Sequence, residues 1–284
     1  MRKTAFIIDS ASFLSEKEAK ELGLYFLPLN IIIDNKDYQE GVNLDIDNLY
    51  NALELNKQTS TSQPSPGLME DLIKKLKNDG YERAIFSGIA SGLSKTQENF
   101  KAQAELLNFE LHVIDSKSVG YSQLNSLLKV RDLIENHDMQ PIVAINHVQE
   151  DLALSKTMLI VDDLNHLSKS GRMSATAAKI GGMLQIKPIL QLNNDDGGKM
   201  MIADKVRTSK KAYKKMVDLM LAEVKDLKDY IILLAQFDAQ EASEMILKDI
   251  NTRYPNNTVV QKTLVPTVGV HTGLNTVGMQ IAKK

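Results

Sequence analysis

Residues 5–10 read Ala-Phe-Ile-Ile-Asp-Ser, an apolar run that ends in two polar side chains. A short run without polar interruption is typical of a strand that is buried on both faces, as the strands of a parallel sheet are. Two more strand-like runs lie at 84–86 and 111–114, and the second again ends in Asp-Ser, at 115–116. We expect these runs to be strands of one mainly parallel sheet.

Helical patterns separate these strands. Ser15 and Glu18 have the spacing of a capping box, and Gly23 is a suitable end for the helix that they begin. Strand–helix alternation of this kind predicts an α/β domain whose sheet carries helices on both faces. The other expected elements are helices at 45–55, from 66 onward, at 96–107 and at 121–136, a strand at 24–33 and a polar loop at 58–66.

The second half of the chain has a different pattern. Two strand-like runs, 187–192 and 199–206, flank the sequence Asp-Asp-Gly-Gly at 195–198, which predicts a hairpin. Further strands are expected at 157–161, 230–237 and 258–265, with helices after 209 and at 240–253. A hairpin combined with helices predicts a mixed sheet. The predicted fold class is therefore α/β with two α/β domains, residues 1–150 with a mainly parallel sheet and residues 151–284 with a mixed sheet.

Composition narrows the possible functions. The chain has 284 residues, a net charge of −2 and no cysteine. The lack of cysteine excludes disulfides, thiol catalysis and thiolate metal sites, and the charge balance argues against nucleic-acid binding through bulk positive charge. The first apolar run is too short for a signal peptide, and no apolar run reaches 18 residues. We expect a cytoplasmic protein.

Common enzyme motifs do not match. Ser94 lacks the second glycine of a nucleophile elbow, and the glycine pair 273 and 278 is followed by Met279-Gln280 where a phosphate-binding loop needs Lys and Ser or Thr. The five histidines have no metal-ligand spacing. The acidic pairs at 162–163 and 195–196 are interpreted as solvated turns. The sequence therefore predicts no metal, no cofactor and no catalytic motif.

Hydroxyl-rich loops remain as candidates for binding. They follow predicted strands or begin predicted helices, where the ligand crevice of an open α/β sheet lies. Hydroxyl groups and helix N-terminal amides suit an anion such as a carboxylate or phosphate, although each loop can equally be a helix cap or a turn. The loops are Asp9-Ser10, Thr61-Ser62, 91–96 and Asp115-Ser116.

Seven motifs occur in a fixed order along nearly the whole chain. They are Ile8-Asp9-Ser10, Pro28-Leu29, Thr61-Ser62-Gln63-Pro64-Ser65, Ser91-Gly92-Leu93-Ser94-Lys95-Thr96, Ile114-Asp115-Ser116, Leu-Ser-Lys-Ser-Gly-Arg-Met at 167–173 and Lys187-Pro188-Ile189-Leu190. This set resembles the DegV family, whose best-understood members are the fatty-acid-binding subunits of bacterial fatty acid kinase. The resemblance implies two α/β domains with one long-chain fatty acid between them. It also implies a protein that does not catalyse, because a separate kinase subunit phosphorylates the bound carboxylate.

The resemblance implies specific site residues. The family's carboxylate-binding hydroxyls match Thr61, with Ser62 beside it, and Ser94, and the family's late histidine matches His271. Two arginines near the head group or the kinase surface match Arg172 and Arg207. The chain departs from the usual residues of the family at Ile8, Lys95, Ser170, Leu274 and Asn275.

Two alternatives to a fatty-acid carrier stay open. One is an acyl-transfer or hydrolytic enzyme with Ser94 as nucleophile and His271 as base. The other is a lipid-responsive interaction protein without a kinase, which the five departures allow.

Three further expectations concern the ligand and the surface. A fatty-acid carrier is expected to contain an elongated apolar tunnel. The twelve methionines either line this channel or fill ordinary core space. The basic run 205–215 is either a solvated helix face or a docking patch for an acidic kinase surface or for membrane head groups.

Overall fold

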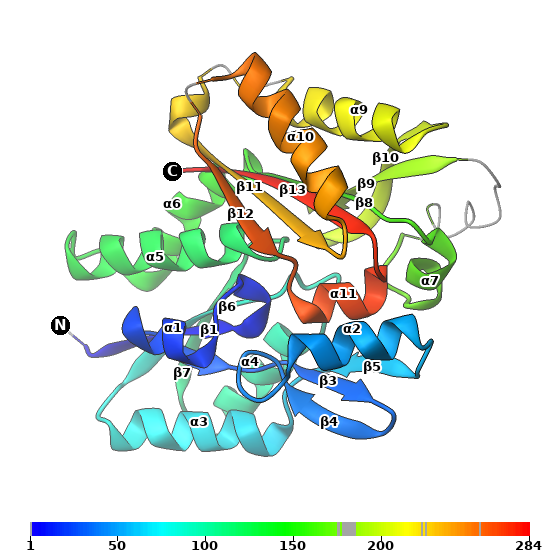
Figure 1. Ribbon diagram of the computed structural model, residues 1–284. Helices are drawn as coiled ribbons and strands as arrows, with labels where there is room; N and C mark the ends of the chain where they lie inside the picture. The colour runs from blue at the N-terminus through cyan, green and yellow to red at the C-terminus, as the bar shows by residue number, and fades with distance from the viewer. Residues whose placement is uncertain (1, 175–176, 178–185, 223, 225, 256) are drawn as a thin grey trace.

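The computed structural model describes the whole chain except residues 1, 175–176, 178–185, 223, 225 and 256 (Figure 1). The first half is built on a parallel sheet with the strand order β2-β1-β6-β7. The wholly apolar run at its centre becomes β1, as expected. The strands are β1 (Thr4–Asp9), β2 (Tyr25–Leu27), β6 (Arg83–Gly88) and β7 (Glu110–Asp115).

Helices cover both faces of this sheet, which confirms the predicted architecture. Phe6 and Ile8 of β1 pack toward α1, α5 and α6, whereas Ile7, which points to the opposite face, packs toward α3 and α4. The capping box of Ser15 and Glu18 is present at the start of α1. The helices are α1 (Glu16–Glu21), α3 (Pro66–Asn78), α4 (Thr96–Leu106), α5 (Tyr121–Glu135) and α6 (Pro141–Ala153).

The second half is built on a mixed sheet with the order β10-β9-β8-β13-β11-β12. Only β11 and β12 pair in parallel among these neighbours. The predicted hairpin is confirmed, since β9 and β10 pair antiparallel around the short 3₁₀ helix η2 (Asn194–Asp196). The strands are β8 (Lys156–Ile160), β9 (Lys187–Asn193), β10 (Lys199–Val206), β11 (Tyr230–Phe237), β12 (Val259–Thr263) and β13 (Thr276–Lys283).

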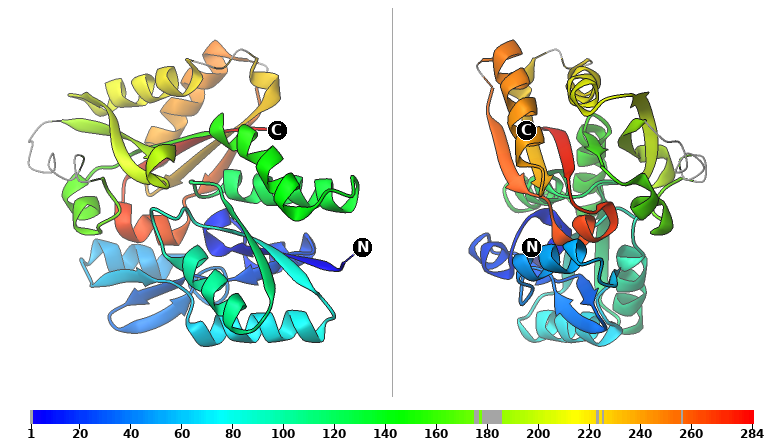
Figure 2. Two further views of the ribbon diagram at one scale, coloured as in Figure 1. Left: turned by 180° about the vertical axis from the view of Figure 1, so that it is seen from behind. Right: turned by 45° about the vertical axis from the view of Figure 1, so that its right-hand side comes forward.

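The two faces of this mixed sheet have different partners. Met158 and Ile160 of β8 pack against α9 (Ser209–Leu221) and α10 (Gln240–Arg253), which lie on the side away from the first half (Figures 1 and 2). Leu159, between them, belongs to an apolar cluster that joins the two halves of the molecule. Three smaller elements occur among the described residues of this half: α7 (Leu164–Lys169), α11 (Pro266–Thr272) and the 3₁₀ helix η3 (Leu227–Asp229).

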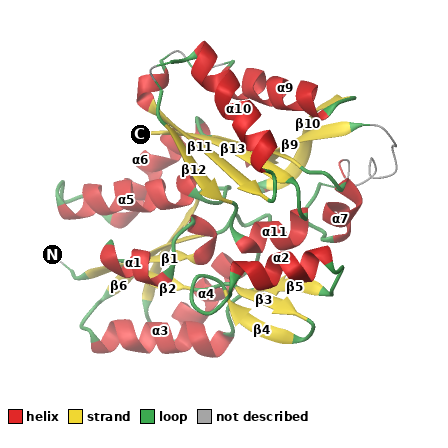
Figure 3. Cartoon of the chain, viewed as in Figure 1, coloured by secondary structure: helices red, strands yellow, loops and turns green. Residues whose placement is uncertain are grey.

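A third, three-stranded antiparallel sheet corrects two sequence expectations (Figure 3). The run 24–33 is two strands rather than one, because Pro28, which has no N–H to donate, follows β2. Part of the predicted loop 58–66 forms β5, which pairs with β3. The elements are β3 (Asn30–Ile33), β4 (Lys36–Gln39) and β5 (Thr59–Ser62), with α2 (Ile46–Glu54) beside them and η1 (Ser10–Ser12) after β1.

Buried polar contacts also join the halves. The Gln280 amide nitrogen on β13 donates hydrogen bonds to Thr157 Oγ1 (2.8 Å) and to the Val119 carbonyl (2.8 Å), and its amide oxygen accepts from the Ser122 N–H (3.0 Å). The domain boundary near residue 150 stays a prediction, and α6 runs across that position. No helix within the described part of the chain is both long and apolar enough to cross a membrane.

Candidate functional site

The candidate site lies where β5, α11 and the loop after β6 meet. A cavity of about 50 Å³ occupies this place. Its polar lining includes Thr61, Ser62, Ser94, Arg172 and His271, and its apolar lining includes residues from both halves of the chain: Leu29, Ile89, Leu93, Met200 and Val268. Five of the six predicted site residues are therefore brought together.

Thr61 and His271 are in direct contact across 210 positions of the sequence. The Thr61 Oγ1–His271 Nε2 distance is 2.7 Å. Thr61 is half-buried on β5, between the exposed Ser60 and Ser62, because side chains alternate along a strand. His271 lies near the end of α11, which Pro266 begins and Gly273, with φ +77°, ends.

His271 is neutral at pH 7. Burial, together with electrostatic repulsion from Arg172 and the nearby His166, lowers the pKa of His271 to about 4. His166 Nε2 donates a hydrogen bond to the Val270 carbonyl (2.8 Å), and this bond links α7 to α11. A neutral imidazole with a hydroxyl partner supplies hydrogen bonds to an anion without a fixed positive charge of its own.

Ser94 lies in the loop between β6 and α4. Its Oγ accepts a hydrogen bond from the Thr96 N–H (3.3 Å) and lies 2.9 Å from Thr96 Oγ1. The Ser94 hydroxyl group can therefore serve both as a cap at the start of α4 and as a ligand-binding group, because it also lines the cavity. The neighbouring Lys95 is exposed and pairs with Glu98 (2.6 Å) on α4.

The two predicted arginines have different positions. Arg172 is half-buried, lines the cavity and donates a hydrogen bond from Nε to the Leu93 carbonyl (3.4 Å). Arg207 is exposed after the end of β10 and is not among the described residues that line the cavity. The structure therefore does not bring Arg207 to the candidate site.

A buried carboxyl group that the sequence analysis missed holds the start of α11. Glu40 accepts hydrogen bonds from the Thr267 N–H (2.7 Å), from Thr267 Oγ1 (2.6 Å) and from Ser10 Oγ (2.6 Å). Thr267 and His271 are four residues apart on α11 and therefore share a face of this helix. Burial raises the pKa of Glu40. No local pattern around residue 40 indicates this role, because its partners come from distant segments.

Asp9, at the end of β1, is a second buried carboxyl group. It accepts hydrogen bonds from the Ile89 N–H (2.7 Å), the Ala11 N–H (3.1 Å) and the Gln123 side chain (2.5 Å). Burial raises the pKa of Asp9 to about 7, although these hydrogen bonds act in the opposite direction. Asp9 thus fixes the loops after β1 and β6 rather than lining the cavity.

The cavity of about 50 Å³ accommodates a few water-sized groups. The elongated apolar tunnel stays a prediction. The inter-half apolar cluster continues from the cavity between β3, α2 and the mixed sheet, through Ile31, Leu49, Leu190 and Leu233. Four of the nine methionines after residue 150 fill ordinary core space behind that sheet, at positions 158, 216, 220 and 279.

A polar groove of about 740 Å³ adjoins the cavity and shares Ser94 and Arg172 with it. The β9–β10 turn forms one wall, where the Gly92 N–H donates a hydrogen bond to the Gly197 carbonyl (2.8 Å). A Cβ atom at Gly92 would lie 2.7 Å from the Asp196 carbonyl oxygen, so this close approach requires glycine. No group of three or more potential metal-ligating side chains occurs among the residues that the structure describes.

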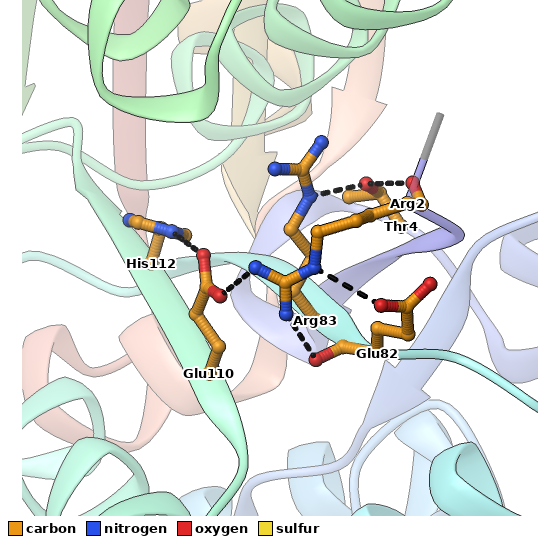
Figure 4. A network of polar contacts seen from close by, with 6 residues as sticks. All are labelled: Arg2, Thr4, Glu82, Arg83, Glu110 and His112. Atoms are coloured by element: carbon orange, nitrogen blue, oxygen red, sulfur yellow. Dashed lines mark hydrogen bonds and ion pairs between the residues drawn. The ribbon is translucent and has the colours of Figure 1, made fainter.

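Another polar network lies at the opposite, amino-terminal end of the parallel sheet (Figure 4). Arg2 contacts Glu82 (3.1 Å) and Glu110 (2.5 Å), and His112 contacts Glu110 (2.7 Å). Ligands of such sheets bind at the carboxyl ends of the strands, and these residues are at the other end. We therefore assign this exposed network to the surface and not to the candidate site.

Comparison with known proteins places the chain in a family. Residues 3–284 match the family described as "Uncharacterised protein, DegV family". The chain belongs to the DegV family. A DegV domain-containing protein of Streptococcus pyogenes serotype M3 is 33% identical over 257 residues, which cover 89% of this chain and 90% of that protein. One of Listeria innocua is 29% identical over 281 residues, 98% of this chain and 97% of that protein.

Solved structures of the family share the fold. The fatty acid binding DegV family protein of Streptococcus agalactiae has a TM-score of 0.87 and 31% identity, with all of both chains covered. DegV of Bacillus subtilis, described as a fatty acid binding protein, has a TM-score of 0.87 and 25% identity, again over both whole chains. The resemblance seen in the sequence motifs and the predicted two-part α/β fold are thus confirmed.

Proposed function

We propose that this protein binds a long-chain fatty acid and presents its carboxylate to a separate fatty acid kinase. The observation that carries the proposal is the Thr61–His271 pair, which lies with Ser94 and Arg172 at the polar end of an apolar cluster. A buried carboxylate is costly unless several donors meet it. The Thr61–His271 pair, the hydroxyl of Ser94 and the guanidinium of Arg172 together supply such donors.

The acyl chain would extend into the inter-half apolar cluster. Each buried methylene contributes about 0.8 kcal/mol, so the acyl chain supplies most of the gross binding energy. The cavity adjoins this cluster, so the acyl chain would lie between the two halves of the molecule. The description of the Streptococcus agalactiae relative as a fatty acid binding protein supports this assignment.

The polar groove provides the route for phosphorylation. A carboxylate oxygen held beside Ser94 and Arg172 would attack the γ-phosphoryl group of ATP on the kinase and yield an acyl phosphate and ADP. The groove reaches both residues from the surface. The guanidinium of Arg172 suits the charge that develops during phosphoryl transfer.

We expect one long-chain fatty acid to be recovered for each chain of the purified protein. The acyl chain and the hydrogen-bonded carboxylate make its dissociation slow. Native mass spectrometry would give the mass of the complex, and denaturing extraction would release the fatty acid for identification. A protein that carries no fatty acid, and that takes none up from a palmitate-like ligand added in excess, would contradict the proposed function.

A His271→Ala substitution should weaken fatty-acid retention and lower acyl-phosphate formation by an added kinase subunit. The isolated parent protein should show no turnover of activated acyl esters. The geometry supports this expectation, because His271 contacts Thr61, whereas Ser94 contacts Thr96. Ester cleavage by the parent protein alone that depends on both Ser94 and His271 would favour the enzyme instead.

A further inference from the structure

Helix α11, which carries His271, lies at the junction of the two halves (Figure 1). It contacts β3, β5 and α2 of the first half and α7 of its own half. Near its end, His166 Nε2 donates a hydrogen bond to the Val270 carbonyl (2.8 Å). At its start, Val265 precedes the helix and its side chain makes no capping hydrogen bond. The start of α11 therefore depends on an acceptor from another part of the chain.

Glu40, in the first half, is that acceptor. Its carboxyl group receives hydrogen bonds from both the N–H (2.7 Å) and the hydroxyl group (2.6 Å) of Thr267, the second residue of α11. A side-chain oxygen that accepts from the N–H of the second helical residue is the contact that an N-cap residue normally supplies. Glu40 makes this contact from 227 positions away, and it thereby ties the start of α11 to the first half.

The carboxyl group of Glu40 is itself held in place. The residue is 2% exposed, and Ser10 Oγ, its other partner (2.6 Å), accepts a hydrogen bond from the Leu29 N–H (3.0 Å). The Glu40 N–H donates to the Leu29 carbonyl (2.9 Å). Gly41, which follows, has φ +76°, and a Cβ atom there would lie 2.9 Å from the Phe26 ring. The acceptor is therefore fixed to the first half before α11 meets it.

Glu40 is not among the described residues that line the cavity, but its partners are. Thr267 and Leu29 both line it, as His271 does. The hydroxyl hydrogen of Thr267 is directed to Glu40, so Thr267 connects the helix to Glu40. Because Thr267 and His271 are one turn apart on α11, the Glu40 contact determines where the His271 imidazole lies relative to Thr61.

We infer that Glu40 is a positioning residue, which holds α11 against the first half so that His271 meets Thr61 at the head-group site. The effect on fatty-acid binding rests on the proposed function, whereas the effect on the imidazole does not. Without Glu40, the start of α11 loses its acceptor while its end stays bonded to α7. The 2.7 Å contact between His271 and Thr61 is then lost.

The first test measures fatty-acid binding by the delipidated whole protein, at a temperature where urea unfolding shows every variant to be folded. Glu40→Ala should weaken binding by about tenfold in Kd, because one hydrogen-bonding group of the head-group site is misplaced. Glu40→Gln keeps an acceptor for the Thr267 N–H and should bind nearly as the parent does. Equal binding by Glu40→Ala and the parent would overturn the inference.

A control variant separates positioning from loss of stability. Ile246→Ala removes a fully buried side chain from α10, on the face of the mixed sheet that points away from the site. It does not touch α11 and should bind fatty acid as the parent does. A loss of affinity as large as that of Glu40→Ala would show that lowered stability alone weakens binding, and this would overturn the inference.

A double-mutant cycle tests whether Glu40 acts through His271. In a His271→Ala background no imidazole is left to position, so adding Glu40→Ala should change Kd by less than about twofold. The same loss in both backgrounds would show that Glu40 acts on binding by another route, which would overturn the inference.

The pKa of His271 gives a measurement that needs no ligand. Burial and repulsion from Arg172 and His166 lower this pKa to about 4, and an imidazole released from its position should titrate closer to the ordinary value of about 6.5. Nuclear magnetic resonance should therefore show a raised His271 pKa in Glu40→Ala and an unchanged one in Glu40→Gln. Loss of a negative charge alone would lower the pKa instead.

The outcomes distinguish this inference from the proposed function. An unchanged or lowered His271 pKa in folded Glu40→Ala would overturn the inference, whatever the protein binds. A parent protein that binds no fatty acid would contradict the proposed function instead, and a raised His271 pKa in Glu40→Ala would still support the positioning role.

Discussion

Replacing either Thr61 or Ser94 by alanine should weaken fatty-acid binding by about one to two decades in Kd while the protein stays folded. Losing one hydrogen bond to a charged group costs about 1.5–3 kcal/mol. Thr61→Ala has a second effect, because it also removes the partner that lies 2.7 Å from His271 Nε2. Calorimetric titration of delipidated protein with a long-chain fatty acid would measure both losses.

Two control variants make this prediction specific. Thr61→Ser keeps the hydroxyl group and should retain most of the affinity. Ser60→Ala removes a hydroxyl from the same strand, but at an exposed position that does not line the cavity, and it should bind as the parent does. If Thr61→Ala and Ser94→Ala both bind with the affinity of the parent, the head-group assignment is wrong.

Sequence patterns predicted the elements whose signals are local. The apolar run of β1, the capping box of Ser15 and Glu18, and the β9–β10 hairpin each depend on residues close together in the chain, and each is present. The strand β5 was missed because Thr59–Ser62 is polar, and its position depends on pairing with β3. Polar strands of this kind are recognised through their partners, not through their own composition.

The candidate site depends even more than β5 on contacts that local sequence patterns do not predict. Residue patterns alone indicated hydroxyl-rich loops suited to an anion, and the family resemblance was needed to add His271 to them. The contact of His271 with Thr61 joins segments 210 positions apart. Glu40 gave no signal at all, since its role depends on Ser10 and on Thr267, 227 positions away. Contacts between distant segments are set by the packing of the two halves and have no local signature.

A Glu40→Ala substitution should lower the free energy of unfolding by about 2–4 kcal/mol. It leaves the Thr267 N–H and two hydroxyl groups without their buried acceptor, and each unsatisfied group costs about 1–3 kcal/mol. The substitution also removes the cost of burying the Glu40 carboxyl group away from water, and this offsets part of the loss. Urea unfolding at pH 7 would measure it, and Glu54→Ala, at an exposed position on α2, should stay within about 0.5 kcal/mol of the parent.

The same carboxyl group should make stability depend on pH. Burial raises the pKa of Glu40, and it raises the pKa of Asp9 to about 7, so the folded state holds protons that the unfolded state has lost. The contribution of these two carboxyl groups to stability is fully present at pH values below their pKa values in the unfolded state. It is lost as the pH rises through their pKa values in the folded state. His271, whose pKa is lowered to about 4, acts oppositely between about pH 4 and 6.5.

Glu40→Gln removes the contribution of Glu40 and leaves that of His271 equal in parent and variant. Glutamine keeps an acceptor for the Thr267 N–H and does not titrate. The free energy of unfolding of the Glu40→Gln variant should therefore rise relative to that of the parent between pH 5 and pH 8. Removing the charge of Glu40 also lowers the pKa of Asp9, which acts in the same direction. Urea unfolding at both pH values checks the sign, and a stability difference that is constant or falls with pH would show that Glu40 is already ionised in the folded protein at pH 5.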